Sequence, residues 1–121
     1  MSTVLLVEDS RTETEVLTRF LKQAGLEVIS VASSEDARLK LQLYKPDLVL
    51  IDVILPGQSG FEFCRELKTN ANTQGIPVVI CSTKGTEVDK LWGLLLGADA
   101  YMPKPVEQEE LIHTVKRLMT V

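Results

Sequence analysis

The stretch "KPDLVLIDVILPG", Lys45 to Gly57, contains one carboxylate inside an otherwise apolar run. Leucine, valine and isoleucine stand on both sides of Asp52, and such residues are typical of strands that are buried on both faces. An ionised carboxylate in apolar surroundings is very costly unless another group compensates its charge. The stretch therefore predicts a buried strand that ends at Asp52, with a compensating group beside that side chain.

The composition indicates one compact domain. The chain has 121 residues, of which 45% are hydrophobic, enough for a core of its own. The net charge of −4 argues against a nucleic-acid-binding surface, because neutralising phosphates needs a basic patch. The apolar runs are too short for membrane insertion, and no basic region precedes the first of them, so we expect no signal peptide. Cys64 and Cys81 lack metal-ligand spacing and are interpreted as buried thiols in a reducing cytoplasm.

Short apolar runs alternate with helical patterns along the whole chain. Strands are expected at Thr3–Val7, Leu26–Ala32, the run between Pro46 and Asp52, Pro77–Ser82 and Asp99–Met102. Helices are expected between and after them, with Ser34 as the cap of the second, Thr86–Leu96 as the fourth and Glu107–Met119 as the last. The strict alternation and the continuously apolar strands predict an α/β fold. It is a doubly wound five-stranded parallel sheet in the order 2-1-3-4-5, with five flanking helices.

Three carboxylates fall at the ends of strands that are neighbours in this order. Glu8 and Asp9 end the first strand and Asp52 ends the third. All three should meet at the carboxyl edge of the sheet, where such folds bind their ligands. Carboxylates this close repel each other, and Mg²⁺ is a cation that prefers carboxylate, water and phosphate oxygens. The pattern therefore predicts a magnesium site at this edge.

Two further polar residues stand at the same edge. Ser82 ends the fourth strand with a hydroxyl, and Lys104 follows the fifth with an ammonium group. A metal ion, a hydroxyl, a lysine and a carboxylate nucleophile are what phosphoryl transfer to an aspartate needs. In this interpretation Asp52 attacks, while the metal and Lys104 neutralise the phosphoryl oxygens.

Four segments, "VLLVEDS", "PDLVLIDVILPGQSGFEFCRELK", "PVVICSTK" and "GADAYMPKPV", together resemble the receiver domain of two-component response regulators. The resemblance covers residues 1–121 as one receiver domain and implies the flavodoxin-like fold of CheY. It implies a cytoplasmic signalling switch rather than an enzyme. Such a domain accepts a phosphoryl group from a sensor histidine kinase, catalyses only its own phosphorylation and dephosphorylation, and signals by docking to a downstream protein.

The same resemblance bears on the type of regulator. Because no output domain follows Val121, we expect a stand-alone, CheY-like regulator that is a monomer or a weak dimer. Ala100 stands where receivers of transcription factors often carry the aspartate of an interchain salt bridge, which puts their mode of dimerisation in doubt. The segment "GTEVDKLWGLLLGADAYMPKPV" further resembles PilH-type regulators of pilus-based motility.

The resemblance also gives the acidic residues their roles. It implies that Asp52 is the phosphoacceptor and that Glu8 and Asp9 hold Mg²⁺ together with Asp52. The main-chain carbonyl of Ile54 would be the remaining protein ligand.

The other polar residues receive roles in the switch. Ser82 would bind the phosphoryl group and Lys104 would pair with it. Tyr101 matches the aromatic residue that swings inward when Ser82 moves, although a simple role as core filler is the alternative. The bond from Lys104 to Pro105 is expected to be cis.

The fourth expected helix, "TEVDKLWGLLLGAD", carries more apolar surface than one packed stripe can bury. The predicted buried stripe consists of Val88, Leu91 and Leu94 or Leu95. Trp92 and one of Leu95 or Leu96 should then stay exposed, and we interpret these three residues as the docking surface for a downstream protein. The alternative for Trp92 is that it seals the edge of the core.

Three other functions fit parts of the pattern. A metal-dependent phosphohydrolase that forms an aspartyl phosphate commonly needs a second acid two residues after the nucleophile, where this chain has Ile54. A flavodoxin-like cofactor site needs a first loop rich in Ser, Thr and Gly, whereas "EDSRTETE" is acidic and would repel a phosphate. A phosphorylation-independent adaptor would not need the complete set of polar residues.

Overall fold

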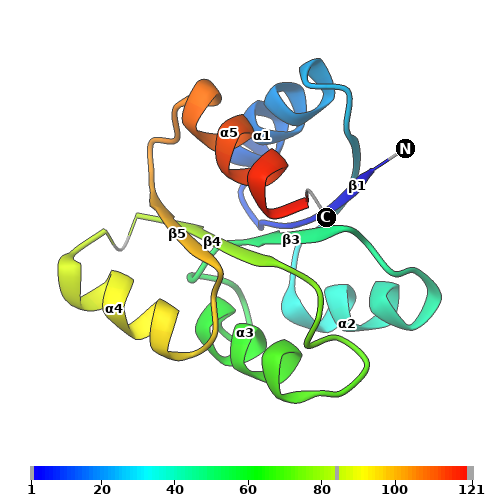
Figure 1. Ribbon diagram of the computed structural model, residues 1–121, viewed down its shortest axis with the longest axis vertical. Helices are drawn as coiled ribbons and strands as arrows, with labels where there is room; N and C mark the ends of the chain where they lie inside the picture. The colour runs from blue at the N-terminus through cyan, green and yellow to red at the C-terminus, as the bar shows by residue number, and fades with distance from the viewer. Residues whose placement is uncertain (1, 84, 120–121) are drawn as a thin grey trace.

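The computed structural model describes residues 2–83 and 85–119. The elements are β1 (Thr3–Val7), α1 (Arg11–Gln23), β2 (Glu27–Val31), α2 (Ser34–Leu43), β3 (Leu48–Ile51), α3 (Gly60–Thr69), β4 (Val78–Ser82), α4 (Glu87–Leu95), β5 (Ala100–Pro103) and α5 (Gln108–Met119). The strands form one parallel sheet in the order β2-β1-β3-β4-β5, which confirms the predicted fold class. Helices α1 and α5 cover one face of the sheet, and α2, α3 and α4 cover the other (Figure 1). Within the described residues, no helix is both long and apolar enough to span a bilayer.

The central strands send their side chains into two separate cores. In β3, Val49 and Ile51 pack with Phe63 of α3, whereas Leu48 and Leu50 pack with side chains of α1 and α5. Successive side chains of a strand point to opposite faces, so a strand that is covered on both sides must be apolar at every position. This double burial explains why the sequence shows a continuous apolar run instead of an alternation.

Several predicted element ends differ from the structure by one residue. Asp52 directly follows β3 instead of lying within it. The cap of α2 is Ser33, whose hydroxyl accepts a hydrogen bond from the N–H of Asp36 at 3.1 Å. Ser34, the predicted cap, is the first helical residue, and its buried hydroxyl donates to the carbonyl of Gln58 at 3.1 Å. With adjacent serines, either hydroxyl could cap the helix, and the tertiary bond of Ser34 decides between them.

Both cysteines are free and buried, as predicted. Burial raises the pKa of the Cys64 thiol to about 11 and that of the Cys81 thiol to about 12. The reactive thiolate is therefore scarce at neutral pH, and the buried sulfur atoms are also shielded from reagents. We expect the native protein to react with iodoacetamide at least about tenfold more slowly than the urea-unfolded protein, as followed by intact mass. Equal rates in the two states would contradict this burial.

Helix α4 buries a different face from the one predicted. The predicted stripe is wrong, because Val88, Leu91, Leu94 and Leu95 are between 50% and 76% exposed. The buried residue of α4 is Gly93, where an added Cβ would lie 2.7 Å from the ring of Tyr101. The helix thus approaches β5 through a residue without a side chain. Apolar periodicity could not reveal this face, because its central residue carries no apolar side chain.

The exposure of the proposed docking residues follows from this arrangement. Trp92 is 53% exposed and Leu95 is 70% exposed, which confirms the prediction that Trp92 and one of Leu95 or Leu96 stay partly exposed. Leu96 is half-buried and caps the carboxyl end of the helix. The outer face of α4 is therefore more apolar than predicted, since it also includes the leucines that were expected inside.

Candidate functional site

Three carboxylates meet at the carboxyl edge of the sheet, as predicted. Glu8 and Asp9 follow β1, and Asp52 follows the neighbouring strand β3. One carboxylate oxygen from each lies within 4.8 Å of the others. Strand pairing continues past the strand ends and fixes this arrangement: the N–H of Asp52 donates to the carbonyl of Val7 at 3.1 Å, and that of Glu8 to the carbonyl of Val31 at 3.0 Å.

Lys104 supplies the charge that compensates Asp52. Its Nζ donates to Oε1 of Glu8 at 2.5 Å and to Oδ2 of Asp52 at 3.4 Å, and its side chain is only 6% exposed. Burial alone lowers the pKa of Lys104, but the hydrogen bond to Glu8 and the charges of Asp52, Glu8 and Glu13 outweigh burial, so this pKa is raised. The ammonium therefore stays charged at neutral pH. The peptide bond from Lys104 to Pro105 is cis, as expected.

The acidic side chains differ in their environments. Asp9 is exposed, whereas Glu8 is buried and accepts a hydrogen bond from the N–H of Ser10 at 3.2 Å. Burial raises the pKa of Glu8, and the hydrogen bonds from Lys104 and Ser10 oppose this rise. The three side chains fit Mg²⁺, because they offer only carboxylate oxygens, and the exposed position of Asp9 leaves room for further oxygen ligands.

The loop after Asp52 begins against its own carboxylate. The N–H of Ile54 donates to Oδ1 of Asp52 at 3.4 Å, so the two residues lie in one tight turn. The carbonyl of Ile54, which the family resemblance assigns to the metal, belongs to this same turn. Its role as a ligand stays a prediction.

Ser82 and Tyr101 lie together beside the acidic cluster. Ser82 ends β4 and is fully buried, and its side chain hydrogen-bonds that of Tyr101. The half-buried ring of Tyr101 stacks on Phe61 with centroids 6.4 Å apart. Burial raises the pKa of Tyr101, and the hydrogen bond with Ser82 opposes this rise. The contact is compatible with the switch and with a filler of the core, so the switch stays a prediction.

One acidic residue near the site was not predicted. Glu13, in the first turn of α1, places Oε2 3.8 Å from Nζ of Lys104. Its sequence signal was its place one helical turn beyond Asp9, at the start of a helix that leaves the same edge of the sheet. In a segment as acidic as "EDSRTETE", this position alone does not distinguish Glu13 from its neighbours.

A second unpredicted residue, Gln58, anchors the loop that follows Asp52. Its backbone and side-chain polar groups are all bonded to α2 and α3. The N–H donates to Glu35 at 3.2 Å, the carbonyl accepts from Ser34 at 3.1 Å, the side-chain oxygen accepts from Arg38 at 2.5 Å, and the side-chain amide donates to Glu66 at 3.1 Å. A glutamine with all these groups bonded holds the loop in one place. No local sequence motif predicts this role.

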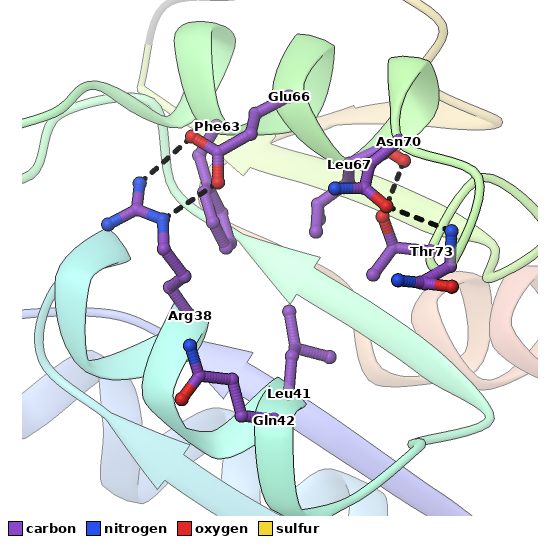
Figure 2. Close-up of a pocket in the computed structure, with 9 residues that line it drawn as sticks. Arg38, Leu41, Gln42, Phe63, Glu66, Leu67, Asn70 and Thr73 are labelled. Atoms are coloured by element: carbon purple, nitrogen blue, oxygen red, sulfur yellow. Dashed lines mark hydrogen bonds and ion pairs between the residues drawn. The ribbon is translucent and has the colours of Figure 1, made fainter.

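A pocket of about 510 Å³ between α2 and α3 lies apart from the carboxylates (Figure 2). Phe63, Leu41 and Leu67 supply its apolar lining. At its polar end, the guanidinium of Arg38 is already paired with Glu66, with Nε and Oε2 2.8 Å apart. The lining includes no member of the acidic cluster, so the candidate site is the edge of the sheet and not this pocket.

Comparison with known proteins agrees with the geometry. The family model of the response regulator receiver domain matches residues 4–116. The chain belongs to the receiver domain family. This receiver domain is 40% identical over 119 residues to the protein PilH of Pseudomonas aeruginosa, covering 98% of each chain. The resemblances to receiver domains and to PilH are thereby confirmed.

Solved structures show the same fold. The chemotaxis response regulator CheY4 of Vibrio cholerae is 30% identical, with a TM-score of 0.89 over 98% of both chains. The receiver domain of a sensor histidine kinase from Pseudomonas aeruginosa is 26% identical, with a TM-score of 0.89 over 98% of this chain and 97% of that one. That structure holds a magnesium ion in its active site cleft. As a family, receiver domains act as signalling switches that histidine kinases phosphorylate, and they bind Mg²⁺ at an acidic pocket.

Proposed function

We propose that this chain, residues 1–121, is a single-domain response regulator that accepts a phosphoryl group on Asp52 and signals by docking. The observation that carries this proposal is the meeting of three carboxylates within 4.8 Å beside the buried ammonium of Lys104. The phosphoryl donor is a sensor histidine kinase in the cytoplasm. The 40% sequence identity to PilH favours a process related to motility.

Phosphoryl transfer follows from the positions of the chain's own groups. A carboxylate oxygen of Asp52 attacks phosphorus on a phosphohistidine, so that a P–O bond forms while the P–N bond breaks and the imidazole leaves with its electron pair. Lys104, now 3.4 Å from Oδ2 of Asp52, moves its ammonium to the phosphoryl oxygens. Mg²⁺, when held by Glu8, Asp9, Asp52 and the carbonyl of Ile54, supplies the further positive charge that the transferring group needs.

The hydroxyl of Ser82 connects this chemistry to α4. When that hydroxyl turns to the phosphoryl group, it releases Tyr101, whose ring lies against Gly93. Because Gly93 is the buried residue of α4, a movement of the ring changes how this helix sits on the sheet. The exposed side chains of α4, Trp92 and Leu95 foremost, are then the surface that a downstream protein reads.

Incubation with Mg²⁺ and acetyl phosphate, followed by intact-mass measurement, tests the acceptor function. We expect the mass to rise by one phosphoryl group and the rise to vanish when EDTA removes the metal. An unchanged mass with Mg²⁺ present would contradict the proposal, and an equal gain in EDTA would contradict its dependence on metal.

The response of α4 can be followed through Trp92, the one tryptophan of the chain. We expect a saturating phosphoryl analogue, beryllofluoride with Mg²⁺, to change its fluorescence, because its neighbour Gly93 contacts the switch ring. The Asp52→Asn protein, which should not bind the analogue, is the control. If the fluorescence does not change with the analogue, although mass measurement shows that acetyl phosphate phosphorylates the protein, the conformational response does not involve α4.

Docking is tested by partner capture. We expect Trp92→Ala and Leu95→Ala each to weaken the capture of proteins retained by the phosphorylated wild type by about tenfold or more, as buried interface anchors do. Leu43→Ala on α2, where the leucine is 76% exposed, is the matched control and should capture them normally. Equal capture by all variants would move the output surface away from α4.

A further inference from the structure

Lys104 pairs with three carboxylates, and the proposed metal site would use two of them. Its Nζ lies 2.5 Å from Glu8, 3.4 Å from Asp52 and 3.8 Å from Glu13. Glu8 and Asp52 belong to the cluster that can hold a metal ion, together with Asp9, and Glu13 does not. A cation held by the cluster would therefore compete with the ammonium for its two nearest partners and leave Glu13 as the third.

The start of α1 places Glu13 beside Lys104. Ser10 caps the helix, and its hydroxyl accepts a hydrogen bond from the N–H of Glu13 at 3.3 Å. In a complete capping box, the carboxylate three residues after the cap would bond back to the N–H of the cap. Here the N–H of Ser10 donates to Glu8 at 3.2 Å instead. The carboxylate of Glu13 pairs with Lys104 and remains 41% exposed.

We propose that Glu13 is a positioning residue that receives Lys104 when Mg²⁺ occupies the acidic cluster. This inference rests on the proposed function. The Lys104 side chain is only 6% exposed, and a buried ammonium is costly without a partner. Loss of the contacts with Glu8 and Asp52 is therefore unfavourable for Lys104. Glu13 lowers this cost, because its oxygen lies just beyond hydrogen-bond distance and a small movement of Lys104 joins them.

Two consequences follow from this arrangement. Glu13 tightens Mg²⁺ binding, since it offers the displaced ammonium a new partner. It also keeps that ammonium beside the acidic cluster, within reach of a phosphoryl group that arrives on Asp52. Glu13 touches neither the acceptor nor the metal and acts only through Lys104.

Titration of the unphosphorylated protein with magnesium chloride at constant ionic strength, followed by amide NMR shifts at the acidic cluster, tests the inference. We expect Glu13→Gln to weaken Mg²⁺ binding about fivefold. The matched control is Glu15→Gln, which removes one negative charge from an exposed position of the same helix and should change the affinity less than about twofold. Equal losses in the two variants would overturn the role of Glu13 and leave only a general charge effect.

A double-mutant cycle with Lys104→Met separates positioning from other effects. Without the ammonium, we expect tighter Mg²⁺ binding than in the wild type, and Glu13→Gln should then cost no more than Glu15→Gln does. A fivefold loss that persists in the Lys104→Met background would overturn the inference. A wild type that binds no Mg²⁺ would overturn the metal site of the proposed function itself, so the two failures are distinguishable.

Discussion

Replacing Asp52 with asparagine should abolish phosphorylation by acetyl phosphate or by a histidine kinase. The amide has no anionic oxygen to attack phosphorus. Glu8 and Glu13 also pair with Lys104, but in the proposed site Glu8 holds the metal and Glu13 holds the ammonium, so neither replaces the acceptor. We expect the rate of phosphorylation to fall by about a thousandfold or more, as for loss of a catalytic nucleophile. Intact-mass measurement after incubation with Mg²⁺ and the donor provides the readout.

The matched control stands at the opposite end of the same strand. Asp47 is exposed just before β3, where its carboxylate accepts a hydrogen bond from the N–H of Thr3 at 2.7 Å. Asp47→Asn should be phosphorylated as the wild type is, because it lies at the amino edge of the sheet. Asp9→Asn should be phosphorylated only at raised Mg²⁺ concentration. Normal phosphorylation of Asp52→Asn would refute the assignment of the acceptor.

The parts of the site that the sequence predicts are those that depend on the order of the strands. Asp52 follows a strand that is apolar at every position, which indicates burial on both faces and hence a parallel sheet. In such a sheet every carboxyl strand end lies at one edge, so Glu8, Ser82 and Lys104 can be placed there without knowledge of any contact.

The parts that the sequence does not predict depend on single tertiary contacts. Gln58 bonds to two helices at once, and Glu13 turns to Lys104 because Glu8 occupies the N–H that a capping box would use. Gly93 decides which face of α4 is buried, although a glycine has no weight in an apolar pattern. These contacts depend on the shape of neighbouring elements, and local propensity and periodicity carry no information about that shape.

Substituting Gly60 with alanine should destabilise the domain strongly, against the usual helix propensities. Gly60 is the first residue of α3, and its N–H donates to the carbonyl of Val53 at 2.9 Å. A Cβ at this position would lie 2.0 Å from the carbonyl oxygen of Asp52 and 2.9 Å from Cα of Val53. Both obstacles are backbone atoms of the loop that carries the acceptor, so no side-chain rotation can relieve the clash.

The steric clash and the helix propensity of alanine change the stability of the protein in opposite directions. In a helix without such an obstacle, alanine is more favourable than glycine by about 1 kcal/mol. Here we expect Gly60→Ala to lower the free energy of unfolding by about 3 kcal/mol or more, measured by urea unfolding with circular dichroism. Gly75→Ala is the matched control, because a Cβ there meets nothing within 4 Å, and its effect should stay within about 0.5 kcal/mol. Equal stability of the two variants would contradict the close packing of α3 on the acceptor loop. Any folded Gly60→Ala protein should also be phosphorylated more slowly than Gly75→Ala, since the backbone that must shift is that of Asp52 itself.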